Sequence, residues 1–207
     1  MFDHTVSIDV FKAAPVFPRN KDVHLLASYA ESTLPEGMVL EFGVFKGGNI
    51  RSLAAAHAPG IVWGFDSFTG LPEKWVVNPR GRVKRKGHFS IGGRLPQVPD
   101  NVQLVKGFFC DTLPEWYAEH AAPIAFLHMD ADLYSSTIEV LDILNPSIVP
   151  GTVIVFDELH FFQNEGRYTE WRDGEWKAMT EWMEKYDRRI EVLSRASRWA
   201  ATLRVVQ

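Results

Sequence analysis

The chain of 207 residues contains a single cysteine, Cys110. No disulfide can therefore form within the chain, and a metal site built from several thiolates is excluded. Such sparing use of cysteine fits a reducing compartment, so we expect a cytoplasmic protein. The N-terminal segment lacks a basic stretch followed by an apolar core, and it does not have the pattern of a signal peptide.

Long apolar runs and an excess of positive charge are also absent. No apolar stretch approaches the roughly 20 residues that a membrane-spanning helix needs. The formal net charge is −4, which disfavours an electrostatic nucleic-acid surface. With no visible repeat or linker, we expect one domain over residues 1–207. Its expected partner is a small molecule, not a nucleic acid or a membrane.

Apolar periodicity predicts strands that alternate with helices. Strands are expected at 38–42, 61–65, 102–106, 124–129 and 153–156, followed by a closing pair at 190–193 and 199–205. Helices are expected at 22–32, 49–57, 114–120, 137–144 and 175–186. This alternation predicts an α/β fold in which helices cover both faces of a mostly parallel sheet. Residues 1–36 would form an N-terminal arm and helix, and the loop-rich segment 67–100 would form a lid over a site.

A glycine turn within Val39–Ile50 follows the first predicted strand. The segment reads V-L-E-F-G-V-F-K-G-G-N-I, with Glu41, Gly43 and Gly47 in the pattern acidic-x-Gly-x-x-x-Gly. Turn glycines allow a ligand to approach the backbone, and the following helix start offers free N–H groups. The pattern is neither G-x-G-x-x-G nor the Walker lysine motif. It favours a nucleotide ligand without pyrophosphate, although a structural turn would use the same glycines.

Asp66 ends the second predicted strand. An acid at this point of a βαβ unit accepts hydrogen bonds from ribose hydroxyls. The alternative role is that of an ordinary turn or helix-capping aspartate.

Further carboxylates follow the fourth and fifth predicted strands, at Asp130, Asp132, Asp157 and Glu158. Close carboxylates repel one another, and a hard divalent cation such as Mg²⁺ relieves the repulsion. His160 lies two residues after the last acid, and a packed or hydrogen-bonded imidazole is favoured there over a metal ligand.

Five segments together resemble the macrocin O-methyltransferase family. They are L-E-F-G-V-F-K-G-G, F-D-S-F-T-G-L-P-E, K-G-F-F-C-D-T-L-P, H-M-D-A-D-L-Y and G-T-V-I-V-F-D-E-L, in order over residues 37–160. The resemblance implies a class I, S-adenosylmethionine-dependent enzyme that methylates hydroxyls of natural-product sugars or aromatics. It also implies a Rossmann-like sheet of seven strands with the last strand antiparallel.

The resemblance implies roles for individual residues. Cofactor contacts fall on Glu41, Gly43 and Gly47 for the methionine part, on Asp66, Ser67 and Phe68 for the ribose, and on Gly107, Phe108 and Asp111 for the adenine, with Asp130 beside them. A Mg²⁺ ion would be held by Asp130, Asp157 and Glu158. The family more often has two aspartates at the last pair, so Glu158 is a departure that leaves the metal's identity open.

The function predicted from the sequence is Mg²⁺-dependent O-methyl transfer from S-adenosylmethionine to a small-molecule hydroxyl. Asp132 is the predicted general base, with His160 as the alternative. A cofactor-binding module without turnover and a nucleotide-dependent oxidoreductase remain as other classes, although the latter would require the missing G-x-G-x-x-G. A nucleobase N-methyltransferase would carry an Asn/Asp-Pro-Pro-aromatic motif where D-A-D-L-Y stands.

Two further features have more than one interpretation. The basic run Arg80–Lys86 is either a solvated loop or a clamp for an acidic ligand. A C-terminal set of aromatic residues could line an acceptor pocket, fill the core or form a homodimer interface. This set comprises Phe161, Phe162, Tyr168, Trp171, Trp176 and Trp182.

Overall fold

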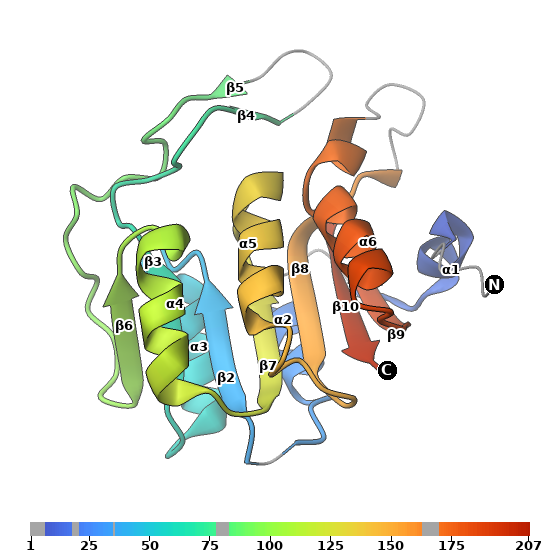
Figure 1. Cartoon of the computed structure of the whole chain (residues 1–207), viewed down its shortest axis with the longest axis horizontal. Helices are drawn as coiled ribbons and strands as arrows, with labels where there is room; N and C mark the ends of the chain where they lie inside the picture. The colour runs from blue at the N-terminus through green and yellow to red at the C-terminus, as the bar shows by residue number, and fades with distance from the viewer. Residues whose placement is uncertain (1–6, 18–20, 35, 78–82, 163–169) are drawn as a thin grey trace.

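The computed structural model describes residues 7–17, 21–34, 36–77, 83–162 and 170–207. In this part of the chain one large sheet contains β1 (Val16–Phe17), β2 (Met38–Phe42), β3 (Val62–Asp66), β6 (Val102–Lys106), β7 (Ile124–Met129), β8 (Val153–His160), β9 (Ile190–Ala196) and β10 (Trp199–Val205). Their order is β1-β9-β10-β8-β7-β2-β3-β6 (Figure 1). Tyr168 and Arg80–Arg82 lie outside the described residues.

The sheet is mostly parallel, as the sequence predicts. β10 pairs antiparallel with both β8 and β9, and the other pairings within the sheet are parallel. The predicted Rossmann-like sheet with an antiparallel last strand is therefore confirmed. The two-residue strand β1, which pairs with β9, adds an eighth strand to the expected seven.

Helices cover both faces of the sheet (Figure 1). On one face, α2 (Lys21–Tyr29) and α3 (Gly48–His57) pack over apolar residues of β2, β3 and β7. On the other face, α4 (Phe109–His120), α5 (Tyr134–Leu144) and α6 (Glu175–Lys185) cover a larger aromatic-rich core. The short helix α1 (Ile8–Ala13) lies near β9. None of the described helices is both long enough and apolar enough to cross a bilayer.

The chain changes direction across the sheet between β2 and β7. From β2 it proceeds outward to β3 and β6, and from β7 it proceeds the opposite way to β8. A crevice forms beyond the carboxyl ends of strands at such a switch point, and ligands bind there in open α/β sheets. Gly43 and Asp130 follow these two strands directly, and the Asp130 amide donates to the Phe42 carbonyl at 2.9 Å.

Several elements extend beyond their predicted bounds, and α4, α5 and β8 are the ones that affect the site. α4 begins at Phe109 and α5 at Tyr134, so both helices start close to the switch-point crevice. β8 continues to His160, which places Asp157 and Glu158 within a strand instead of after it. Within the segment 67–100, the strands β4 (Trp75–Val76) and β5 (Val83–Lys84) form an antiparallel pair.

Candidate active site

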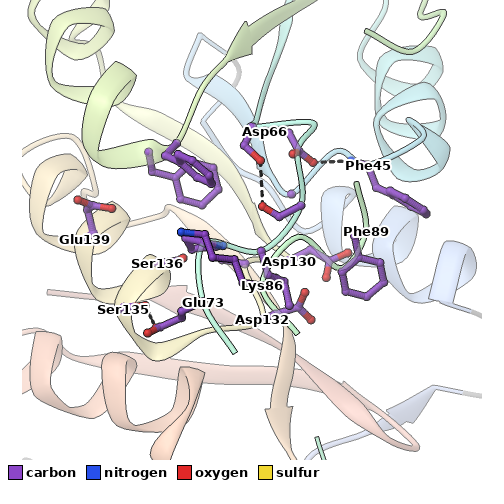
Figure 2. Close-up of a pocket in the computed structure, with 18 of the residues that line it drawn as sticks. Phe45, Asp66, Glu73, Lys86, Phe89, Asp130, Asp132, Ser135, Ser136 and Glu139 are labelled. Carbon is purple, nitrogen blue, oxygen red and sulfur yellow. Dashed lines mark hydrogen bonds between the residues drawn. The ribbon is translucent and has the colours of Figure 1, made fainter. Parts of the chain in front are cut away.

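A cavity of about 780 Å³ lies at the carboxyl ends of the central strands (Figure 2). Gly43, Asp66, Gly107 and Asp130 line it from the ends of β2, β3, β6 and β7. The segment 67–100 contributes a further wall, made by Ser67, Gly70, Leu71, Pro72, Glu73, Lys84, Lys86 and Phe89. The volume lies within the roughly 300–1,000 Å³ of ordinary ligand pockets.

The glycine turn brings backbone close to this cavity. Gly43 has a φ of 95°, which residues with a side chain rarely adopt, and a Cβ there would overlap the Asp130 carbonyl oxygen. Gly47 also has a positive φ, 78°, and precedes the first residue of α3. It is not among the cavity-lining residues, so its role is to turn the chain into the helix.

Asp66 is held in place by the two loops beside it. Its Oδ2 accepts the Phe45 amide at 2.7 Å, and its Oδ1 accepts the Phe68 amide at 2.6 Å. Burial raises the pKa of this carboxyl, and these backbone donors act in the opposite direction. Each carboxylate oxygen has a second lone pair. A diol could therefore bind to a carboxylate whose position is already fixed.

The other predicted cofactor residues divide into two groups. Ser67, Gly107 and Phe108 line the cavity, whereas Phe68 is fully buried and Asp111 is exposed in the first turn of α4. Glu41 is also fully buried, and its Oε2 lies 3.2 Å from His128 Nδ1. Burial raises the pKa of Glu41, with the His128 hydrogen bond opposing the shift. The structure thus places Glu41 within the packed sheet layer and not in the cavity wall.

Three of the predicted carboxylates meet at the cavity. Asp130, Asp132 and Glu158 line it, whereas Asp157 does not. Successive side chains of a strand point to opposite faces, and β8 carries both Asp157 and Glu158. Asp157 is 4% exposed and acts electrostatically on His24 of α2. Asp132 has a φ of 62°, so a tight left-handed turn follows Asp130 and keeps both residues at the cavity.

The donor chemistry of this wall fits Mg²⁺ only in part. Carboxylate oxygens are its preferred ligands, and the ion commonly takes one or two of them together with waters. Asp130, directly after β7, and Glu158 of the neighbouring strand β8 both line the cavity and could supply two such oxygen ligands. A convergent group of three or more His, Cys, Asp or Glu ligands is not found among the described residues. The predicted trio with Asp157 is therefore not assembled in this arrangement.

His160 lies away from the cavity. The ring is fully buried and stacks on Phe162, with ring centroids 4.3 Å apart. Neither ring nitrogen has a hydrogen-bond partner of standard geometry within the described chain. Burial, assisted by the nearby Arg195 charge, lowers the pKa of His160 to about 4, and weak backbone interactions with Ala200 and Ala196 oppose this shift.

Several lining residues were not predicted from the sequence. Ser135 and Ser136 line the cavity because α5 begins before its predicted start. The Ser135 hydroxyl donates a hydrogen bond to the Glu73 carboxylate at 2.6 Å. Lys84 and Lys86 belong to the basic run, so the described part of this run forms part of the cavity wall. Lys84 lies over the rings of Trp75 and Phe89. Glu139 of α5 completes this side of the wall, and burial raises its pKa.

The sheet order and the switch-point cavity are those of a Rossmann-like fold. Solved structures of methyltransferases share it. The crystal structure of CalS11, a calicheamicin methyltransferase, superposes with a TM-score of 0.65 at 27% identity, covering 88% of this chain and 77% of that one.

Within this class, residues 93–189 match the family described as Macrocin-O-methyltransferase (TylF). The predicted family resemblance is thereby confirmed. One relative is the 8-demethyl-8-(2,3-dimethoxy-alpha-L-rhamnosyl)-tetracenomycin-C 4'-O-methyltransferase of Streptomyces olivaceus, 30% identical over 149 residues, 62% of this chain and 56% of that protein. Another is the demethyldecarbamoylnovobiocin O-methyltransferase of Streptomyces niveus, 30% identical over 143 residues, 59% of this chain and 52% of that protein. The chain thus spans little more than half the length of these curated relatives.

Proposed function

We propose that this protein transfers a methyl group from S-adenosylmethionine to a hydroxyl of a small molecule, either a natural-product sugar or an aromatic compound. One observation carries the proposal: Asp66 and the pair Asp130 and Asp132 line the same cavity at the switch point. The names of the relatives as O-methyltransferases support the same reaction.

The cofactor would lie along the ends of β2, β3 and β6. When bound, it supplies an electrophilic methyl group on a positively charged sulfur. Gly43 would leave room for its methionine part, Asp66 would accept the ribose hydroxyls, and Gly107 and Phe108 would border the adenine. Carboxylates beside a positively charged ligand stabilise it, and Asp130, which lines the cavity, would do so here. Glu41, Gly47 and Phe68, which do not line the cavity, would support the shape of the site from behind its wall.

The acceptor hydroxyl would lie between Asp132 and the cofactor site. Holding two reactants in line removes much of the entropic cost of their meeting. Asp132 would take the hydroxyl proton as the general base. We propose that Asp130 and Glu158 hold Mg²⁺, which when bound orients the hydroxyl and lowers its pKa. The segment 67–100, whose Glu73, Lys86 and Phe89 line the cavity, would act as the lid that excludes water.

Thermal unfolding with added S-adenosylhomocysteine tests cofactor binding. A ligand that binds only the native state raises the melting temperature, and we expect this for the wild type. Asp66→Ala should weaken the shift because it removes the acceptors of the ribose hydrogen bonds. Asp111→Ala is the matched control, since Asp111 is exposed and does not line the cavity, and it should retain the shift.

Turnover tests the rest of the proposal. Stabilisation by nicotinamide dinucleotides instead of S-adenosylhomocysteine would favour an oxidoreductase. Binding of S-adenosylhomocysteine without methyl transfer to any sugar or phenol would favour a cofactor-binding module.

A further inference from the structure

A second cavity, of about 370 Å³, adjoins the first. Glu73, Asp132 and Glu158 line both cavities, so the predicted base faces each of them. The walls of the second cavity, hereafter the aromatic chamber, carry four large rings. These rings belong to Trp75 of β4, Tyr134 of α5, Trp171 of the 3-10 helix η2 (Glu170–Asp173), and Trp199 of β10. Trp171, Trp176 and Trp182 of the predicted aromatic set all belong to the buried core, and of these three Trp171 alone also lines the aromatic chamber.

Trp199 reaches the aromatic chamber through an unusual backbone. Its φ is 70°, a left-handed conformation that is rare for a bulky residue. The pairing of β10 with β8 also shifts register here, because Trp199 faces His160 while Ala201 faces Phe156. Such irregularities re-aim side chains and recur beside active sites. Behind it, Phe161 stacks on the Trp199 indole with centroids 4.3 Å apart, so the ring is supported in this position.

Polar groups without partners lie under the same chamber. Glu175 is fully buried and lines it, and its Oε2 accepts the Glu158 amide at 2.9 Å. Its Oε1 and the Trp171 Nε1 have no hydrogen-bond partner within the part of the chain that the structure describes. Buried polar atoms are nearly always paired in native proteins, and each exception needs a reason. A ligand with oxygen substituents would give both atoms a partner.

We infer that the aromatic chamber binds one ring of the methyl acceptor, with Trp199 as the specificity-determining residue on which the ring stacks. The ring's hydroxyl groups would meet Glu175 Oε1 and Trp171 Nε1, while the hydroxyl to be methylated would face Asp132 at the boundary with the cofactor cavity. The required chemistry is a flat apolar face with oxygen substituents. Phenolic rings and pyranose sugars both have it. This inference rests on the proposed function, because it names what the acceptor side of the site binds.

Binding of small ring compounds to the protein tests the role of the aromatic chamber without requiring methyl transfer. Catechol and methyl α-rhamnopyranoside are the two probes, titrated into the full chain by isothermal calorimetry with and without S-adenosylhomocysteine. We expect one of them to bind the wild type and Trp199→Asn to weaken it about tenfold, the usual worth of a stacked ring. Asparagine tolerates the left-handed backbone, so this change removes the indole while keeping the turn. Trp199→Phe should restore most of the affinity.

Two further variants make the result specific. Trp75→Ala removes a ring from β4 and should also weaken the probe, which keeps the test informative if the β10 variant does not fold. Phe161→Leu alters the support of Trp199 without removing a chamber wall and should cost less than Trp199→Asn.

The outcomes separate the inference from the proposed function. Failure of both probes to bind, or equal probe affinity in the wild type and in Trp199→Asn, overturns the chamber assignment. Failure of S-adenosylhomocysteine to bind overturns the proposed function, and the probe titrations without it still report on the chamber. Whichever probe binds identifies the acceptor ring as phenolic or sugar-like.

Discussion

Replacing His160 by phenylalanine should stabilise the protein in acid and leave methyl transfer intact. The His160 ring is fully buried and has its pKa lowered from 6.5 to about 4. Between these values the unfolded chain binds a proton that the folded protein does not, so stability is lost as the pH falls. The contribution is fully present above about pH 6.5 and absent below about pH 4.

The magnitude follows from the size of this shift. At pH 5 a neutral buried histidine with these two pKa values costs about 2 kcal/mol relative to a residue that does not titrate, and the limit at lower pH is about 3 kcal/mol. Phenylalanine would keep the stack on Phe162 and would remove two ring nitrogens that have no hydrogen-bond partner of standard geometry in the described chain. Near pH 7 the larger ring could cost about 1 kcal/mol through overpacking.

Urea unfolding between pH 4.5 and 7.5, followed by circular dichroism, measures the difference between His160→Phe and the wild type. His24 is also buried with a pKa lowered to about 4, and it is present in both proteins. Its charge is a minor cause of the lowered His160 pKa, so the difference between the two proteins reports mainly on His160. A difference that does not grow as the pH falls would refute the reasoning. Turnover is the second readout, because a folded His160→Phe variant without activity would make His160 the base.

Three more predictions concern the cavity. Asp132→Asn should lower the maximal rate about 10²–10⁴-fold, the usual worth of a general base, with little change in metal affinity; recovery of the rate with added Mg²⁺ would make Asp132 a metal ligand. Excess chelator should abolish turnover while preserving the melting shift with S-adenosylhomocysteine, and full activity in chelator would contradict a role for the metal. Asp130→Asn should reduce metal-dependent activity more than Asp157→Asn does, because of these two residues only Asp130 lines the cavity. Gly43→Ala should destabilise the protein by at least roughly 1–2 kcal/mol through its left-handed backbone and impair cofactor binding. Gly48→Ala, where an added Cβ meets nothing within 4 Å, is the control, and equal melting temperatures for the two variants would contradict the argument.

The sequence predicts the sheet well because its strands are short apolar runs with clear ends. The bounds of β2, β6, β7 and β10 agree with the predicted strands residue for residue. The predicted first residues of the helices agree less well with the structure. Proline favours the first turn of a helix, so the sequence predicts a start at Pro114, whereas α4 already begins at Phe109 and contains Pro114.

Placement of the site residues depends on information that local sequence does not contain. Asp157 and Glu158 are adjacent, and the sequence alone treats them as a pair beyond a strand. Pairing with β10 extends β8 through both of them, so only Glu158 lines the cavity. Lys86 reaches the wall through the long segment 67–100, whose path no periodicity specifies. The aromatic chamber likewise combines β4, α5 and β10, which are distant in sequence.

A crystal structure of the complex with S-adenosylhomocysteine tests the central claim most directly. The account predicts the ribose hydroxyls on the Asp66 carboxylate, the methionine part beside Gly43, and the sulfur directed toward Asp130 and Asp132. A ligand bound elsewhere, or bound in this cavity with its ribose away from Asp66, would contradict it.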